Sequence, residues 1–181
     1  MSDYRRACTE GGTYFFTVVT YCRRPILVDD KVVNELRLAI RDVKQQSPFV
    51  VDAWVVLPDH MHCVWSLPEG DADYSSRMGK IKSNFTRRVA GRFHDPNLLT
   101  FSKKKKREST IWQRRFWEHE IRDQIDFEKH IDYVHYNPVK HGLVKNIADW
   151  PYSTFHRYVQ NGVYPKDWSG IVETPNQDYG E

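Results

Sequence analysis

The sequence predicts an α+β fold of the ferredoxin-like type, with a mainly antiparallel central sheet and flanking helices. Segments rich in β-branched and aromatic residues alternate with segments in which apolar residues recur every three or four positions. The order along the chain is strand, helix, strand, strand, helix, strand, helix. An antiparallel sheet with helices on one or both faces is the economical arrangement for that order.

The first 67 residues contain the clearest elements. Residues 13–21 are β-branched or aromatic throughout, which is typical of a strand. After this strand, Asp29 or Asp30 can cap a helix that ends near residue 46, because a carboxylate accepts hydrogen bonds from the first turn. Residues 49–57 and 60–67 predict two further strands, joined by a tight turn.

The middle of the chain combines a helix with a basic insert. Ser75 or Ser76 can cap a helix over residues 77–92, whose apolar residues at spacings of three and four predict a core-facing side. An insert around residues 94–108 follows, and its basic run from Lys103 to Arg107 is expected to form an exposed loop.

The last predicted elements are a strand and a helix. Residues 110–117 are aromatic and basic, and we expect them to be extended. Asp123 or Asp126 can start a helix that runs through Tyr133 and ends near Pro138, because proline disrupts helical hydrogen bonding.

Length and composition indicate one domain with a tail. With 181 residues, we expect a single domain over residues 1–148, which includes the insert around 94–108, and a C-terminal tail over 149–181. The three cysteines form no Cys-x-x-Cys pair, which argues against a disulfide framework and fits a reducing cytoplasm. No apolar stretch approaches the roughly 18 residues of a membrane span, so no membrane partner is expected.

Charge is distributed unevenly along the chain. Residues 77–115 contain thirteen Lys and Arg but only Asp95 and Glu108, a net charge of +11, whereas the whole chain carries +3. A basic segment on an acidic body suggests a polyanionic partner bound at one place. The alternative is a solvated loop and helix face.

Two histidines follow the apolar run at residues 53–57. Because side chains two apart on a strand point to the same face, His60 and His62 can bind one metal ion. The alternative is a pair of histidines on a polar strand face.

About seventy residues downstream, Tyr133 and Asn137 lie four residues apart on the last predicted helix, so they share a face. The alternatives are a core tyrosine and an ordinary helix end before a proline. His135 and Tyr136 are competing candidates, but Tyr133 is the better nucleophile candidate because Asn137 lies on its side of the helix.

These four residues together suggest a mechanism. A divalent ion held by His60, His62 and Asn137 would polarise a phosphodiester and offset charge in the transition state. Tyr133 would attack phosphorus and keep one DNA end as a phosphotyrosine, with the metal or His135 assisting its deprotonation. A free 3′-hydroxyl could then re-attack, which is strand transfer without an external energy source.

Several motifs resemble the REP-associated tyrosine transposases of bacteria, within the single-tyrosine HUH endonuclease superfamily. The motifs are YRR at residues 4–6, GGTYFFT at 11–17, AWVVLPDHMH at 53–62, WQRRFWEH at 112–119, DYVHYNPVKHG at 132–142 and DWPYSTFH at 149–156. The resemblance implies the HUH endonuclease fold, with the two histidines on the central sheet. It also implies that Tyr133 is the nucleophile and that Asn137 is the third metal ligand.

The resemblance further implies a partner and a cofactor. The partner is single-stranded or hairpin DNA, cut near imperfect hairpins of repetitive extragenic palindromes (REPs), in the cytoplasm and associated with the nucleoid. The cofactor is magnesium or manganese (Mg2+ or Mn2+), although imidazole-rich sites in general favour zinc, nickel or copper. We expect a monomer rather than a dimer with exchanged tyrosines.

Candidate DNA contacts combine cations with aromatic rings, since single-strand binders pair a basic groove with stacking platforms. In the resembling family the start of the chain helps to read a short guide sequence. The candidates are Arg5 and Arg6 at the N-terminus, Lys82, Arg87 and Arg88 on the second helix, and Trp112, Arg114 and Arg115 in the aromatic segment. The alternative for the tryptophan is a core position.

Three functions remain open from the sequence. The leading hypothesis is a metal-dependent single-strand endonuclease and strand transferase, a tyrosine transposase. The second is a DNA-hairpin-binding protein on the same fold that no longer cuts and has a structural or regulatory role. A zinc-binding domain without a DNA partner is the third. The intact set of His60, His62, Tyr133 and Asn137 favours the first.

Overall fold

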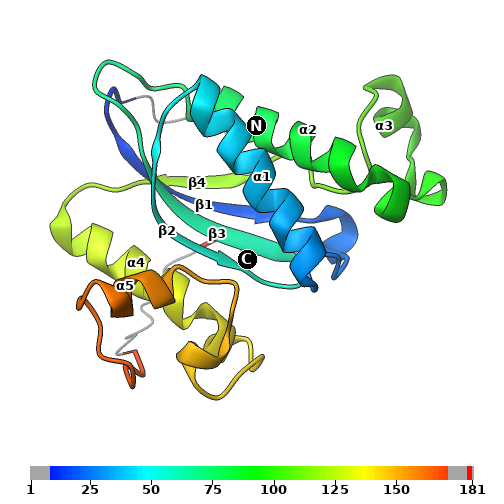
Figure 1. Cartoon of the computed structure of the whole chain (residues 1–181). Coiled ribbons are helices and arrows are strands. Elements are labelled where there is room, and N and C mark those ends of the chain that lie inside the picture. The colour runs from blue at the N-terminus through cyan, green and yellow to red at the C-terminus, as the bar shows by residue number, and fades with distance from the viewer. Residues whose placement is uncertain (1–8, 171–178, 181) are drawn as a thin grey trace.

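The computed structural model, which describes residues 9–170, 179 and 180, has a four-stranded antiparallel sheet with helices on both faces (Figure 1). The strand order is β2-β3-β1-β4. The strands are β1 (Thr13–Val19), β2 (Val50–Val56), β3 (His60–Ser66) and β4 (Trp117–Glu120). The α-helices are α1 (Asp30–Gln46), α2 (Tyr74–Phe93), α3 (Phe101–Lys105), α4 (Gln124–Lys140) and α5 (Phe155–Gln160). The predicted α+β class is confirmed.

Alternation of side chains along the strands divides the core into two layers. On β3, Met61, Cys63 and Trp65 pack with α1 and α2 on one face. Val64 packs with α4 residues on the other face, and His62 lies on this side as well. Since His60 is two residues before His62, both predicted histidines belong to the α4 face.

Aspartates cap the three long helices. The Asp29 carboxylate accepts the Val32 N–H at 2.9 Å, so α1 begins where predicted. Helix α2 begins at Tyr74, earlier than predicted, because Asp73 rather than Ser75 or Ser76 is its cap. The earlier start brings Tyr74 into the core, where its side chain is buried.

Helix α4 continues through a proline. Asp123, one of the two predicted caps, accepts the Asp126 N–H at 2.8 Å. The helix passes Pro138 and ends at Lys140, two residues beyond the predicted end. Proline removes one helical N–H, but the His141 N–H still donates to the Asn137 carbonyl at 3.0 Å. Asn137 therefore lies inside the helix.

The lysine-rich run was predicted as an exposed loop, and this prediction is wrong for part of it. Thr100 caps α3, and Lys103 within α3 is buried. The Lys103 amine donates to the Ser109 carbonyl at 2.9 Å and lies 4.0 Å from the centroid of the Tyr21 ring. Burial of Lys103 is tolerated because its charged end has these partners, and Glu108 lies 3.7 Å away.

The fourth strand lies later than predicted. Residues 110–117 were expected to be the strand, but β4 covers Trp117–Glu120 and pairs with β1 from Thr17 to Tyr14. Arg114 and Arg115 are exposed and precede the strand. Only an isolated bridge between Thr20 and Trp112 joins the earlier segment to the sheet. The pairing register of β1, rather than local residue preference, fixes this strand.

The segment after residue 149 covers the edge of β2. The Val56 N–H donates to the Tyr152 carbonyl at 2.9 Å, and an isolated bridge joins Val55 to Ser153. This segment therefore satisfies backbone groups that an edge strand would otherwise expose. The division at residue 148 stays a prediction. No helix in the described part of the chain is long and apolar enough to cross a membrane.

Candidate active site

His60 and His62 lie side by side on β3 with their ring centroids 4.9 Å apart, and both are buried. His60 Nδ1 lies 2.6 Å from the Asp59 carboxylate, which can only accept, so this nitrogen carries the proton. His62 Nδ1 lies 2.9 Å from the Thr17 hydroxyl. Because that hydroxyl donates its own proton to the Tyr179 carbonyl, it accepts one from His62. In both rings the lone pair is therefore on Nε2.

The Asp59 carboxylate contacts both His60 and the guanidinium of Arg23. Burial opposes ionisation of Asp59, but its hydrogen bonds to His60 and Arg23 outweigh that effect and lower its pKa. The Arg23 guanidinium lies 3.0 Å from the second carboxylate oxygen. The contact between Asp59 and His60 supports a role for this carboxylate in orienting the histidine.

Helix α4 places Tyr133 and Asn137 against the two histidines. The Tyr133 ring centroid lies 5.3 Å from that of His62, and the His141 ring, just after the helix, lies 5.2 Å from that of His60. Asn137 is buried, one turn after Tyr133 and one turn before His141. We call His60, His62, Tyr133 and Asn137 the β3–α4 cluster.

The donor set of the β3–α4 cluster fits a divalent ion. Two imidazoles whose Nδ1 atoms are held by Asp59 and Thr17 would offer Nε2, and an amide would add an oxygen. Imidazole and amide donors together suit several first-row metals, so the donor set alone does not select one.

Lys140, which the sequence analysis did not single out, contacts the Tyr133 hydroxyl. Its amine donates to the Tyr133 oxygen at 2.9 Å and lies 4.8 Å from the ring centroid. Lys140 is seven residues after Tyr133, two helical turns along the same face. That spacing was a usable signal, but the expected helix end near Pro138 concealed it.

The C-terminal Tyr179 covers Tyr133. The two rings are nearly parallel, at 10°, with their centroids 3.6 Å apart, and Tyr133 is only 1% exposed. The Tyr179 backbone carbonyl also binds Thr17. One residue near the end of the chain therefore contacts both the candidate nucleophile and the residue that orients His62. Nothing local in the sequence indicates this contact across the fold.

His135 does not contact the Tyr133 hydroxyl, although it was considered as a possible base. Two positions along a helix lead to a different face, and His135 Nε2 lies 2.9 Å from the Thr154 hydroxyl. Burial lowers the pKa of His135 to about 3. His135 thus connects α4 to the segment before α5.

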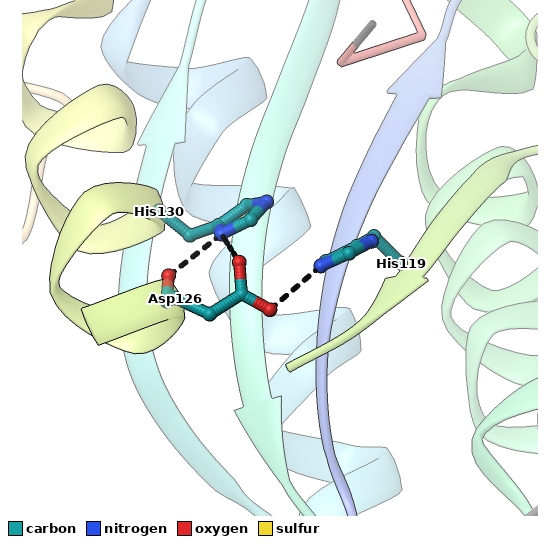
Figure 2. A group of neighbouring side chains, drawn as sticks. All are labelled: His119, Asp126 and His130. Atoms are coloured by element: carbon teal, nitrogen blue, oxygen red, sulfur yellow. Dashed lines mark hydrogen bonds and ion pairs between the residues drawn. The ribbon is translucent and has the colours of Figure 1, made fainter. Parts of the chain in front are cut away.

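A second polar cluster lies at the start of α4 and joins this helix to β4 (Figure 2). We call His119, Asp126 and His130 the β4–α4 cluster. Their ligand atoms lie within 4.8 Å of one another, which is close enough for a metal ion. His130 Nδ1 donates to the Asp126 backbone carbonyl at 2.8 Å and therefore carries a proton, so this nitrogen is not a ligand in this form, whereas its buried Nε2 has no hydrogen-bond partner among the described residues.

The Asp126 carboxylate bridges the two rings of the β4–α4 cluster. It lies 2.9 Å from His119 Nε2 and 3.1 Å from His130 Nδ1. Burial opposes its ionisation, but hydrogen bonds from His119 and the Arg122 N–H lower its pKa. Burial lowers the pKa of His130. The network links the edge strand to the helix that carries Tyr133.

The cations predicted on α2 are largely occupied by protein partners. Lys82 donates to the carbonyls of Gln113 and Arg114 at 2.6 and 3.0 Å. Arg88 forms ion pairs at 3.1 and 2.7 Å with Glu35 and Asp42 of α1. Arg87 is exposed and contacts Asn84.

In the aromatic segment, Arg114 and Arg115 are exposed, as expected for DNA contacts. Trp112 is instead buried, with its ring centroid 5.3 Å from that of Phe85. A base cannot stack on a ring whose faces already pack in the core, so this structure does not support Trp112 as a platform. Arg5 and Arg6 lie outside the described residues.

One groove brings some of the predicted DNA contacts together. It measures about 280 Å³ and lies between α2 and the segment that follows α3. Its lining includes Lys82, Lys103, Arg107, Trp112 and Arg114. Arg87 and Arg88 do not line it and instead border a hollow between α1 and α2.

Comparisons with known proteins agree with this geometry. The family model described as "Transposase IS200 like" matches residues 8–137. A REP-associated tyrosine transposase of Escherichia coli (strain K12) is 51% identical over 95% of this chain and 93% of its own length. A putative REP-associated tyrosine transposase of Haemophilus influenzae is 47% identical over 94% of each chain. A solved REP-associated tyrosine transposase bound to a REP hairpin matches with a TM-score of 0.84 and 49% identity, covering 100% of this chain and 98% of that one.

Proposed function

The chain belongs to the IS200-like transposases, and among them to the REP-associated tyrosine transposases, and from this premise we propose its substrate and mechanism. It cuts and rejoins single-stranded DNA next to REP hairpins, with a divalent metal and a phosphotyrosine at Tyr133. A solved relative is bound to a REP hairpin, which supports hairpin DNA as the partner. The observation that carries the mechanism is the contact between Tyr133, His62 and Lys140.

Chemically, the step is a substitution at phosphorus. The Tyr133 oxygen bonds to phosphorus as the bond from phosphorus to the 3′ oxygen breaks. The 5′ phosphate stays on Tyr133, and the released 3′ oxygen takes up a proton to become a free 3′-hydroxyl. When bound by His60, His62 and Asn137, the ion polarises the phosphate and offsets its developing charge.

The chain's own residues prepare the nucleophile. A phenol has a pKa near 10 in model peptides and is weakly nucleophilic while protonated. The ammonium of Lys140 donates to the Tyr133 oxygen and therefore favours the phenolate, which is the attacking form. Asp59 and Thr17 hold the two histidines in the tautomer that turns lone pairs toward the ion.

The test is covalent trapping of the DNA. The protein is mixed with labelled REP hairpins that carry single-stranded flanks, with manganese, magnesium or a chelator. Wild type is compared with Tyr133→Phe, and Tyr136→Phe is the matched control, a half-buried tyrosine of the same helix. We expect a metal-dependent labelled band that stays with the protein in a denaturing gel, absent only in Tyr133→Phe.

Two results would contradict the proposal. An adduct that persists in Tyr133→Phe would assign the nucleophile to another residue. Tight hairpin binding without cutting or an adduct in any metal would instead support the alternative function, a non-cleaving hairpin-binding protein.

A further inference from the structure

Helix α1 separates its charges onto two sides. On the side facing α2, Glu35 and Asp42 form ion pairs with Arg88. Arg37, Arg41 and Lys44 recur at spacings of four and three, so they form one exposed stripe along a different side. In the part of the chain that the structure describes, no carboxylate forms an ion pair with any of the three. The stripe is therefore a local excess of positive charge.

This stripe borders a groove of about 430 Å³ between α1 and the edge strand β2, which we call the α1–β2 groove. A fourth cation, Arg157 of α5, lies on its opposite side, and apolar groups line it as well. The apolar lining consists of Ile40, Val51 and Trp54. The Arg37 guanidinium lies 5.8 Å from the Trp54 ring centroid. The groove thus combines cations with an aromatic ring that is only partly buried.

The β2 side of the groove is fixed by hydrogen bonds. The backbone N–H of Trp54 donates to the Thr154 hydroxyl at 2.8 Å. The backbone N–H of Thr154 donates to the Trp54 carbonyl at the same distance. Arg157 donates to the Val51 carbonyl at 2.9 Å. Because the backbone of β2 is paired here, a peptide strand cannot add to this edge. The features left for recognition are positive charge, a ring face and an apolar surface.

We propose that the α1–β2 groove binds an unpaired stretch of the DNA substrate, with phosphates at the α1 stripe and a base against Trp54. Basic grooves with aromatic platforms are the general means of binding single strands. The volume of the groove falls in the range of about 300–1,000 Å³ that small-molecule sites occupy, so one nucleotide fits. A duplex stem has no unstacked base to offer Trp54. The inference rests on the proposed function, because it assumes a DNA substrate.

The position of the groove adds a geometric consequence. The groove lies between α1 and β2, whereas Tyr133 belongs to α4. Helices α1 and α4 lie on opposite faces of the sheet (Figure 1). A DNA strand that contacts both must pass from one face of the sheet to the other, and the groove borders the edge strand β2. The proposed contact therefore requires a single-stranded flank outside the hairpin.

The test measures binding of fluorescent REP hairpins with and without single-stranded flanks, by anisotropy over a range of salt concentrations. The groove variant is Arg37→Ala/Arg41→Ala/Lys44→Ala. The control variant is Lys31→Ala/Lys145→Ala/Lys166→Ala, which removes the same charge from exposed positions outside the groove. Circular dichroism and thermal unfolding confirm that both variants are folded.

We expect the groove variant to bind flanked hairpins at least about tenfold more weakly, with unflanked hairpins unaffected. Three lost single-strand phosphate contacts flatten the slope of log K against log salt by about 2. Trp54→Leu should weaken flanked binding by about fivefold or more, including at high salt, because base stacking is not screened.

Each other outcome is decisive. Equal losses in the groove and control variants would reduce the effect to overall charge and overturn the proposal. Equal losses for both hairpins would assign the groove to the stem and also overturn it. A wild-type protein that binds no hairpin would refute the proposed function itself. If instead the wild type cuts DNA and the groove variant cuts it equally well, this inference alone would be refuted. If Trp54→Leu does not fold, the triple variant decides.

Discussion

Helix α4 contributes to two polar clusters, and they differ in where the groups that hold their histidines lie. In the β4–α4 cluster, ring nitrogens of His119 and His130 point at Asp126, a member of the same cluster. In the β3–α4 cluster, Nδ1 of each histidine is held from outside, by Asp59 or Thr17. In the first arrangement both rings bind the one carboxylate of the cluster and so join two elements, although His130 Nε2 has no partner among the described residues. In the second, the Nδ1 contacts leave Nε2 as the ligand atom that each histidine would offer a metal.

The comparison shows that proximity of histidines and carboxylates does not by itself select one of the two clusters as the metal site. The hydrogen-bond acceptor of each ring adds a second criterion, because it fixes which nitrogen is left to bind a metal. Five predictions would break or sharpen this contrast, from the largest expected effect to the smallest.

Replacing a histidine should reveal the largest difference in DNA cutting between the two clusters. His60→Ala or His62→Ala should reduce adduct formation on the order of 10³-fold, since the ion then lacks a ligand and the transition-state charge is not offset. His119→Ala should leave cutting within about threefold and lower stability instead. Adduct assays and thermal melts are measured in parallel. Equal loss of cutting in His60→Ala and His119→Ala would erase the distinction.

Within the β3–α4 cluster, Lys140→Ala should slow adduct formation by about 10- to 100-fold, because a hydrogen bond to a charged group contributes roughly 1.5–3 kcal/mol. The pH–rate profile should also move to higher pH, since the phenolate loses its cationic partner. Lys140→Arg should recover part of the rate, and Lys145→Ala serves as the exposed control. An unchanged profile in Lys140→Ala would remove Lys140 from the mechanism.

Within the β4–α4 cluster, Asp126→Asn should lower the free energy of unfolding by about 2 kcal/mol at pH 7, because two histidines lose their charged acceptor. The folded-state pKa of Asp126 is lowered, so its contribution is present above its unfolded value and is lost as pH falls through the folded one. The gap between wild type and variant should therefore close in acid. Urea titrations at several pH values test this, and a constant gap would contradict the charge argument.

His135 is a histidine in a third kind of environment, because it is buried and none of the groups that shift its pKa is a carboxylate. Its pKa of about 3 lies below the unfolded value of about 6.5, so the unfolded chain binds the proton more readily. Stability should decrease as pH falls from 7 to 5, by about 2 kcal/mol from this group. His135→Gln, which keeps a hydrogen-bonding side chain toward Thr154, should flatten that decrease. Parallel pH dependences in the two proteins would show that His135 is not responsible.

The smallest effect is expected where Tyr179 covers the nucleophile. An aromatic pair contributes about 0.5–1.5 kcal/mol beyond its buried area. Tyr179→Ala should therefore raise the rate of adduct formation by about two- to tenfold at saturating DNA. Tyr164→Ala, which removes a tail tyrosine that stacks on Phe155 and Trp168 instead, is the control. A slower Tyr179→Ala enzyme would mean that the ring orders Tyr133 rather than blocking it.

The elements predicted correctly from the sequence are those that local patterning determines. Strand β1 and helix α1 follow from runs of β-branched residues, helical periodicity and the Asp29 cap. Strand β4 was misplaced because its position depends on pairing with β1. The burial of Lys103 was missed because its partners Ser109 and Tyr21 meet it only in the folded chain.

The same division applies to the site. Spacings of two on a strand and four on a helix were sufficient to select His60, His62, Tyr133 and Asn137, and the fold brings β3 and α4 together. The roles of these residues stay predictions. Thr17 and Tyr179 were out of reach, because they meet the site and each other only in the folded chain and are 162 positions apart in the sequence. Trp112 was predicted as a DNA contact but is buried, because residue type alone does not distinguish a core ring from an exposed one.

The packing of α4 against its own sheet has a consequence for reaction order. Tyr133 and His62 of one chain already touch, so a single molecule contains the nucleophile and the residues proposed to bind the ion. The initial velocity at saturating DNA should then rise in direct proportion to protein concentration. Mixing Tyr133→Phe with His62→Ala should restore no activity, because neither protein can supply its intact half to the other. Each cutting event would be the work of one polypeptide acting alone.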